Sequence, residues 1–236
     1  MNRVVVTGAA GFIGSHLCEA LIDSGARVVG VDAFTDFYEP AQKRANVAEL
    51  IASPNFELFE ADVASASLPE LFHGADAIVH LAGEPGVTTS WGPDFARYVE
   101  RNVLATQRVL EAACLLGISR VVYASSSSVY GAPTDALRAR GEPRPTSPYG
   151  VSKLAGEALV GAYAASSPLT TVSLRYFSVY GPRQRPDMAA HRFIEAMLDG
   201  RPVEIYGDGG QVRDFTFVSD VVAATARAIS ADVPPA

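Results

Sequence analysis

Residues 149–153 read YGVSK. The tyrosine and the lysine at the two ends of this segment could act together in proton transfer. Residues four apart on a helix share one face, so we expect the Lys153 ammonium near the Tyr149 hydroxyl. A neighbouring positive charge favours the phenolate and lowers a phenol pKa that starts near about 10. We therefore expect Tyr149 and Lys153 to be catalytic, with Tyr149 able to take a proton from a hydroxyl group. The same spacing is also common on solvated helix faces.

A serine run, residues 125–128, precedes this segment and ends an apolar stretch that predicts a buried strand. Ligands of doubly wound sheets bind at the carboxyl ends of the strands. Ser126 is therefore placed to hydrogen-bond the hydroxyl that Tyr149 deprotonates and to stabilise the ketone that forms from it.

A glycine-rich turn, residues 8–14 (GAAGFIG), follows the first expected strand and opens the first expected helix. Gly8, Gly11 and Gly14 permit a tight turn, a close approach to a pyrophosphate and close helix packing. The helix N-terminus, with Phe12 and Ile13, presents free N–H groups to that anion. A merely structural turn is the alternative.

Asp32 ends the second expected strand, where an acid accepts hydrogen bonds from the ribose hydroxyls of a dinucleotide. It would repel a 2′-phosphate, which favours NAD over NADP, and the adjacent Ala33 and Phe34 offer no compensating arginine. A capping role in a loop is the alternative for Asp32. Asp62 and Val63 follow the third strand and are expected to contact the adenine. With such a cofactor, the oxidised nicotinamide and Lys153 together would favour the phenolate of Tyr149 and lower its pKa. Tyr149 could then deprotonate a sugar hydroxyl while hydride leaves the same carbon.

Alternating strand and helix patterns must position these residues. Strands are expected at residues 4–6, 27–31, 56–61, 77–81, 120–124 and 171–176, and helices at 13–24, 42–51, 95–116 and 149–165. Such alternation predicts a Rossmann-type α/β fold, a doubly wound parallel sheet. We expect residues 1–180 to form the NAD-binding domain.

Prolines and glycines break the pattern after about residue 181. We expect one helix near residues 192–198 and two short strands near 203–205 and 215–218, which flank a loop at 207–210. Residues 181–236 are thus predicted to form a small, partial substrate-binding region.

The composition limits the class of protein. The 236 residues are 48% hydrophobic and carry a formal net charge of -7, which gives no support for nucleic-acid binding. No apolar run approaches the ~20 residues of a membrane span, and no signal peptide is recognisable. Cys18 and Cys114 are expected to be reduced rather than disulfide-bonded. We expect a cytoplasmic protein without a metal site.

Residues 3–222 resemble the NAD-dependent epimerase/dehydratase family of extended short-chain dehydrogenases/reductases. The matching motifs are residues 7–14, 80–83, 102, 129–131, 148–153, 174–183 and 213–215. The resemblance implies that Tyr149 is the base, Lys153 also binds the nicotinamide ribose, and Ser126 is the catalytic hydroxyl. It places Leu81, Ala82, Gly83, Asn102 and Phe177 at the NAD site and Arg213 at the diphosphate of a UDP- or dTDP-sugar. A surface ion pair is the alternative for Arg213.

The serine run disfavours two of the reactions that members of the family catalyse. The family's dehydratases carry an Asp-Glu pair where this chain has Ser127 and Ser128, and its decarboxylases carry a glutamate at the place of Ser128. What remains is 4-epimerisation of a UDP-sugar by transient oxidation at C4 and return of the hydride to the opposite face. The resemblance is greatest to bacterial UDP-glucuronate 4-epimerases, which implies that Arg185 binds the nucleotide-sugar.

Three serines suggest the sugar. By resemblance, Ser127, Ser128 and Ser178 surround the C5 substituent, and small hydroxyl donors suit a carboxylate. UDP-glucuronate, converted to UDP-galacturonate, is thus the expected substrate; UDP-glucose and UDP-N-acetylglucosamine are the alternatives. The serines could also merely reflect a strand end of small residues.

Length supplies a rival interpretation. Family members usually continue for about another third of this chain, which ends at residues 233–236 where a strand is expected. A shortened, non-catalytic NAD-binding module is therefore the alternative of another class. The family also implies a homodimer through the helices near residues 95–116 and 149–165.

Overall fold

A six-stranded parallel sheet forms the centre of the molecule, for which a computed structural model describes residues 3–131, 141–205, 207–210 and 212–232. The strand order is β3-β2-β1-β4-β5-β6. The strands are β1 (Arg3–Thr7), β2 (Arg27–Asp32), β3 (Phe56–Glu60), β4 (Ala77–His80), β5 (Arg120–Ser126) and β6 (Thr170–Tyr176). The chain starts in the middle of the sheet and winds outward in both directions, so the predicted Rossmann fold is confirmed.

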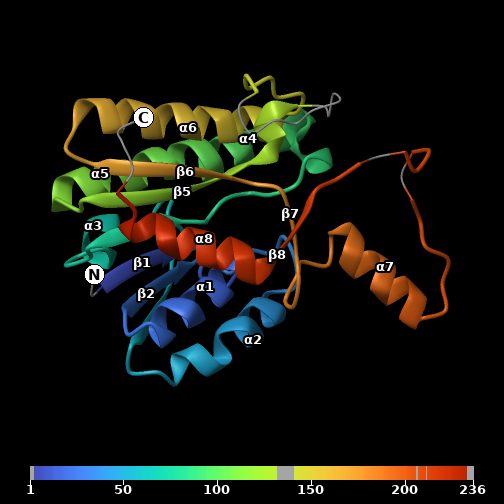
Figure 1. Ribbon diagram of the computed structural model, residues 1–236, viewed down its shortest axis with the longest axis horizontal. Helices are drawn as coiled ribbons and strands as arrows, with labels where there is room; N and C mark the ends of the chain where they lie inside the picture. The colour runs from blue at the N-terminus through green and yellow to red at the C-terminus, as the bar shows by residue number, and fades with distance from the viewer. Residues whose placement is uncertain (1–2, 132–140, 206, 211, 233–236) are drawn as a thin grey trace.

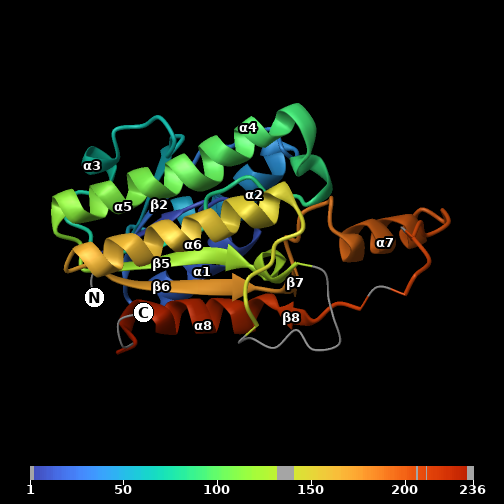
Figure 2. The same ribbon diagram turned by 90° about the horizontal axis from the view of Figure 1, so that it is seen from above.

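Helices cover both faces of this sheet (Figure 1). One face carries α1 (Phe12–Asp23), α2 (Pro40–Ile51) and α8 (Val218–Ser230), and the other carries α3 (Leu68–Leu71), α5 (Ala105–Leu116) and α6 (Pro148–Ser166). Figure 2 shows α5 and α6 lying side by side over the sheet. In the described residues no helix is both long and apolar enough to cross a membrane.

The alternation of strand side chains produces two hydrophobic cores. Val4 and Val6 of β1 pack toward α1 and α8, whereas Val5 between them packs toward α3 and α5. Strands buried on both faces need apolar residues at consecutive positions, which explains the valine runs of β1 and β2. This packing fixes the carboxyl ends of the strands, where the candidate site lies.

The expected helix at residues 95–116 is interrupted by a wider turn. It consists of α4 (Phe95–Tyr98), a π-helical segment (Val99–Leu104) and α5. Such insertions often accompany functional sites. Here the wide turn contains the buried Asn102 and directly follows the buried Tyr98.

The region after residue 177 differs most from the prediction. Residues 203–205 form no strand and are exposed, so the expected strand there is wrong. The strand expected near residues 215–218 is present as β8 (Phe215–Phe217). It pairs in parallel with β7 (Ser178–Tyr180), a second short strand that follows β6. The expected helix near 192–198 is present as the longer α7 (Ala189–Leu198).

Helix α8 was not predicted, although it completes the core. Val221, Val222 and Ile229 are buried in the same cluster as the side chains of α1, so part of the region after residue 181 packs on the central sheet. The boundary at residue 180 stays a prediction. The expectation about residues 233–236 lies outside the described residues.

Candidate active site

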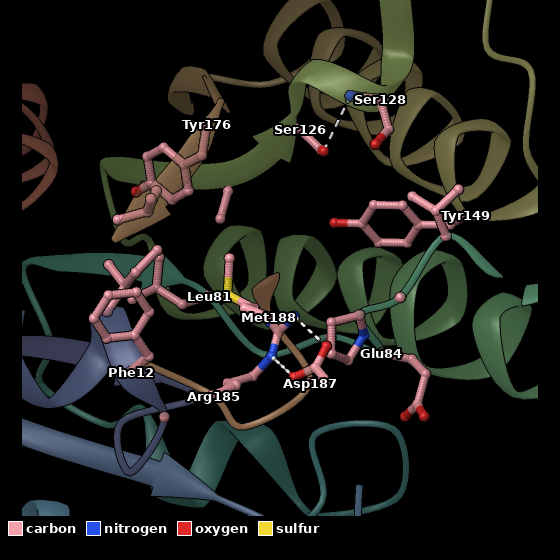
Figure 3. Close-up of a pocket in the computed structure, with 18 of the residues that line it drawn as sticks. Phe12, Leu81, Glu84, Ser126, Ser128, Tyr149, Tyr176, Arg185, Asp187 and Met188 are labelled. Atoms are coloured by element: carbon pink, nitrogen blue, oxygen red, sulfur yellow. Dashed lines mark hydrogen bonds and ion pairs between the residues drawn. The ribbon is translucent and has the colours of Figure 1, made fainter. Parts of the chain in front are cut away.

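A cavity of about 1320 Å³ opens at the carboxyl ends of the central strands (Figure 3). A single drug-sized ligand usually occupies about 300–1000 Å³, so there is room here for two ligands side by side. The sequence-predicted site residues meet in it with one exception, Asn102. The lining includes Gly8, Gly11, Phe12, Ile13, Gly14, Asp32, Asp62, Val63, Leu81, Ala82, Gly83, Ser126, Ser127, Ser128, Tyr149, Lys153, Phe177, Ser178, Arg185 and Arg213.

The glycine turn holds the start of α1 close to the sheet. Gly8 has φ +71°, and a Cβ on it would lie 2.8 Å from the backbone nitrogen of Ala82. A Cβ on Gly14 would overlap the carbonyl oxygen of Gly8. Gly11, the N-cap of α1, provides no side-chain cap, which leaves first-turn N–H groups available to a ligand. This geometry suits an anion at the helix N-terminus.

Asp32 forms the far end of the cavity. Its carboxylate accepts hydrogen bonds from the backbone nitrogens of Ala10, at 3.0 Å, and Phe34, at 2.8 Å. A carboxylate has about four lone-pair sites, so acceptor capacity remains for a ligand. Burial raises the pKa of Asp32, while the hydrogen bond from Phe34 and the charge of Lys43 oppose that rise.

Lys43 is a cavity residue that sequence reasoning missed. Its Nζ donates to the carbonyl and hydroxyl oxygens of Thr35, at 2.9 and 3.0 Å, and lies over the ring of Tyr38. The chain contains only two lysines, Lys43 and Lys153, among its 19 basic residues. Both are buried and both line the cavity. This bias in lysine usage was a signal available in the sequence.

The Tyr149 ring projects into the other end of the cavity from the start of α6 (Figure 3). Ser126 lies at the end of β5, and its Oγ accepts a hydrogen bond from the backbone nitrogen of Ser128, at 3.1 Å. Burial raises the pKa of Tyr149, and the hydrogen bond with Ser126 and the charge of Arg185 only partly offset this. This rise applies to the protein without a cofactor, so the lowering expected from Lys153 together with an oxidised nicotinamide stays a prediction.

The ammonium of Lys153 is held by the backbone at the end of β5. Its Nζ donates to the backbone carbonyl oxygen of Ala124, at 2.9 Å, and burial lowers its pKa to about 8. The spacing correctly placed Lys153 on the same side of α6 as Tyr149, but sequence could not show that a strand carbonyl holds the ammonium. A positive charge from a bound ligand would bring the phenol pKa down.

The start of α6 is fixed by several local contacts. Ser147 caps the helix by accepting a hydrogen bond from the backbone nitrogen of Gly150, at 3.1 Å, and Pro148 occupies the first turn. A Cβ on Gly150 would lie 2.5 Å from the carbonyl oxygen of Ser128. The absent side chain thus lets Tyr149 approach the serine run.

Asn102 lies behind the cavity wall and holds its parts together. Its Oδ1 accepts from the backbone nitrogen of Glu84, at 2.7 Å, and its Nδ2 donates to the carbonyl oxygen of Glu84, at 3.0 Å, and to Ser152 Oγ, at 2.9 Å. A Cβ on Gly83 would lie 2.7 Å from Asn102 Oδ1. Asn102 therefore joins the loop after β4 to α6 and does not line the cavity, and its expected place at the NAD stays a prediction.

The predicted sugar-binding serine and arginine residues lie on different sides of the cavity. Arg185 makes two hydrogen bonds to Asp187, at 2.9 and 3.1 Å, and lies across the cavity from Ser126 and Ser128 (Figure 3). Ser178 lies at the start of β7. Arg213 is exposed, and its guanidinium donates to the carbonyl oxygen of Val212, at 2.8 Å.

Another buried acid that the sequence interpretation missed is Glu84. Only 3% of its surface is exposed, and its carboxylate pairs with Arg101, at 2.6 Å, and with Arg97, at 3.5 Å. Glu84 and Arg101 both line the cavity. No motif in the sequence pointed to this pair, because the two residues belong to separate elements.

Comparisons with known proteins agree with this geometry. Residues 4–235 match the model of the NAD dependent epimerase/dehydratase family. The chain is 46% identical over 221 residues to an uncharacterized UDP-glucose epimerase, YtcB, of Bacillus subtilis, and the match covers 93% of this chain and 70% of that protein. It is 37% identical to a probable UDP-glucuronate 4-epimerase of Rhizobium meliloti, with 99% of this chain and 69% of that protein covered.

A solved structure is also similar over nearly the whole chain. It is a UDP-glucuronic acid 4-epimerase of Bacillus cereus in complex with UDP-glucuronic acid and NAD. The TM-score is 0.95 at 44% identity, and the match covers 99% of this chain and 74% of that one.

Proposed function

Because the chain belongs to the NAD-dependent epimerase/dehydratase family, we propose that it is an NAD-dependent UDP-sugar 4-epimerase that interconverts UDP-glucuronate and UDP-galacturonate. The observation that carries the proposal is the placement of Tyr149, Ser126 and Lys153 at one end of a cavity that continues to Asp32 and the glycine turn. A base and a dinucleotide site in one continuous cavity suit redox chemistry on a bound alcohol.

The residues at the Asp32 end fit NAD. A Cβ on Gly11 would meet only the carbonyl oxygen of Gly8, at 3.2 Å, so the turn leaves an open cradle beside the α1 N-terminus for a diphosphate. Asp32 retains acceptor capacity for ribose hydroxyls, and Lys43 lies next to it. Asp62 and Val63 line the cavity for an adenine, and Lys153 and Phe177 line it at the nicotinamide end.

The chain's own residues would handle the proton and the orientation of the sugar. Bound NAD would supply the acceptor and donor of the hydride at C4 and a positive charge in its oxidised form. Tyr149 takes the proton of the C4 hydroxyl, and Ser126 donates a hydrogen bond to the oxygen that becomes the ketone. Ser127 and Ser128 carry hydroxyls that do not ionise near neutral pH, so the site has no acid–base pair there for removing water.

The three serines and Arg185 support a uronate substrate. A carboxylate accepts several hydrogen bonds, and Ser127, Ser128 and Ser178 can donate them. The 4-keto uronate is a β-keto acid that loses CO2 when its carboxylate leaves the plane of the carbonyl, so fixed donors would protect it. Arg185 would exchange its Asp187 partner for the nucleotide-sugar, and Arg213 would bind the diphosphate.

Turnover by the purified chain tests the proposal. UDP-glucuronate, UDP-glucose and UDP-N-acetylglucosamine would each be incubated with the protein, and products identified by NMR. We expect UDP-galacturonate from UDP-glucuronate. Turnover of only a neutral sugar would rule out the carboxylate site, and NAD binding without any turnover would favour a non-catalytic module.

A neutral UDP-hexose is the second candidate substrate. The similarity to YtcB, which is described as a UDP-glucose epimerase, favours it. Serine hydroxyls can also hydrogen-bond a neutral hydroxymethyl group, so the relative kcat/KM for the sugars decides between the two.

A homodimer and a cytoplasmic location belong to the same proposal. Leu104 and Leu115 of the α4–α5 segment and Val151 of α6 are exposed apolar residues on the outer helix layer. Their exposure suits a helix-to-helix contact between two copies. Both cysteines are free, which suits a reducing compartment. Light scattering of wild type and Leu115→Glu would test the dimer; a monomeric wild type would contradict it.

A further inference from the structure

The side chain of Tyr98 connects the wall of the cavity to the proposed base. Tyr98 is 1% exposed and is the last residue of α4, directly before the wide turn. Its ring packs edge-on against the ring of Tyr149, with centroids 6.2 Å apart and planes at 75°. Tyr149 thus has an aromatic neighbour that limits how its own ring can turn.

The hydroxyl of Tyr98 holds a loop of the cavity wall. Its single proton is shared between the carbonyl oxygens of Pro85, at 2.8 Å, and Gly86, at 3.0 Å. The hydroxyl of Thr89 lies 2.7 Å away. With the one phenol proton directed to the carbonyls, Thr89 donates the proton that lies between the two hydroxyls. Residues 85–89 therefore close around a single phenol oxygen.

The loop of residues 85–89 can adopt few other backbone conformations. Gly86 has φ +101°, and a Cβ there would overlap the Thr89 hydroxyl and lie 3.3 Å from the Tyr98 hydroxyl. Ser90 adds a hydrogen bond to the carbonyl oxygen of Val87, at 2.7 Å. Since Pro85, Gly86, Val87 and Thr88 line the cavity, Tyr98 contacts both the wall and the base without lining the cavity itself.

We propose that Tyr98 is a positioning residue for Tyr149, its ring setting the orientation of the base and its hydroxyl setting the wall formed by residues 85–89. This inference rests on the proposed epimerase function for its kinetic part only. The two halves of the side chain have separable effects. Loss of the ring should lower kcat, because the phenol of Tyr149 is no longer held toward the substrate. Loss of the hydroxyl should raise KM, because the wall is no longer fixed.

Three variants of the NAD-loaded protein test the proposal. Tyr98→Phe keeps the ring and removes the hydroxyl, whereas Tyr98→Leu removes both. Tyr163→Phe, on the same helix as Tyr149, is the control, because its hydroxyl bonds with Gln107 and Glu111 outside the cavity. We expect a KM increase of at least threefold for Tyr98→Phe, a kcat decrease of at least tenfold for Tyr98→Leu, and neither for Tyr163→Phe.

A second readout needs no turnover. The titration of Tyr149 can be followed as the ultraviolet phenolate difference between each protein and its Tyr149→Phe counterpart. In Tyr98→Leu we expect this titration to move to lower pH, because water reaches a phenol that the Tyr98 ring shields. If wild type turns over no UDP-sugar, the proposed function fails, but this titration still decides the role of Tyr98.

Two sets of results would overturn the proposal for Tyr98. A folded Tyr98→Leu with wild-type kcat and an unchanged Tyr149 titration would show that the ring positions nothing. If Tyr98→Leu does not fold, Tyr98→Phe and Thr89→Val decide, because both keep the buried ring. A raised KM in these two variants supports the proposal, and a KM equal to that of Tyr163→Phe overturns it.

Discussion

The ammonium of Lys153 is hydrogen-bonded to the carbonyl oxygen of Ala124, at 2.9 Å, two residues before Ser126 at the end of β5. This bond joins the helix that bears the proposed base to the strand that bears the proposed hydroxyl. It also keeps a positive charge in a buried place where the described residues pair no carboxylate with it, and burial lowers the pKa of Lys153 to about 8.

The first prediction concerns this pKa. In NAD-free protein, a lysine-selective NMR titration should show Lys153 titrating near pH 8, because its charged form is desolvated. The spectrum has only two lysines to resolve, and Lys43 can be assigned with Lys43→Met. A Lys153 titration above pH 10 would contradict the buried geometry.

The same pKa gives a stability change with a definite sign. Between about pH 8 and pH 10.5 the unfolded chain binds more protons at Lys153 than the folded chain does, so folding stability rises with pH. Relative to Lys153→Met, wild type should gain about 3 kcal/mol in free energy of unfolding across that window. Denaturant unfolding at both ends of the window measures this difference, and a pH-independent difference would contradict it.

Asn102 provides the second prediction. In Asn102→Ala the buried N–H and C=O groups of Glu84 lose their partners, which should cost about 2–3 kcal/mol of stability. NAD should also bind more weakly, although Asn102 does not line the cavity, because Gly83 and Glu84 lose their support. Asn55→Ala, at a half-buried site outside the cavity, is the matched control. Equal unfolding free energies for the two variants would show that the Asn102 bonds contribute nothing.

Asp32 provides the third prediction. Asp32→Ala should raise the Kd for NAD by about tenfold or more, because charged acceptors of the ribose hydroxyls are lost. Asp199→Ala removes an acid whose partner, Arg201, lies on the surface, and it should leave the Kd unchanged. Calorimetry measures both, and an unaltered Kd in Asp32→Ala would place the ribose elsewhere.

The fourth prediction concerns sugar selectivity. Ser178→Ala should lower kcat/KM for UDP-glucuronate by about tenfold, since a hydrogen bond to a charged group is lost. The loss for UDP-glucose should be smaller, which makes the neutral sugar an internal control. Equal losses for both sugars would mean that Ser178 does not contact the carboxylate.

Much of the fold could be predicted from sequence because its patterns are local. The valine runs of β1 and β2 and the glycine turn each specify an element within a few residues. Helix α8 has Val221, Val222 and Ile229 at helical spacing, which is a local signal of the same kind. The strand expected at residues 203–205 failed because strand formation needs a partner, which local sequence does not reveal.

The candidate site was predicted less completely because its contacts join distant elements. Motifs placed Tyr149, Ser126 and Asp32 in one cavity. No motif indicates that Lys153 bonds to Ala124, or that the pKa of Tyr149 is raised by burial in the protein alone. The pairing of Glu84 with Arg101 and the support of Tyr149 by Tyr98 depend equally on tertiary packing.

The central claim is that the Tyr149 hydroxyl is the base of a reversible sugar oxidation. The most direct measurement is conversion of UDP-glucuronate by wild type and by Tyr149→Phe, followed by NMR, with NAD binding measured on both. We expect a decrease in kcat of at least about a hundredfold in the variant, in line with the contribution of general bases, and little change in NAD affinity. Conversion by Tyr149→Phe at the wild-type rate would contradict the account.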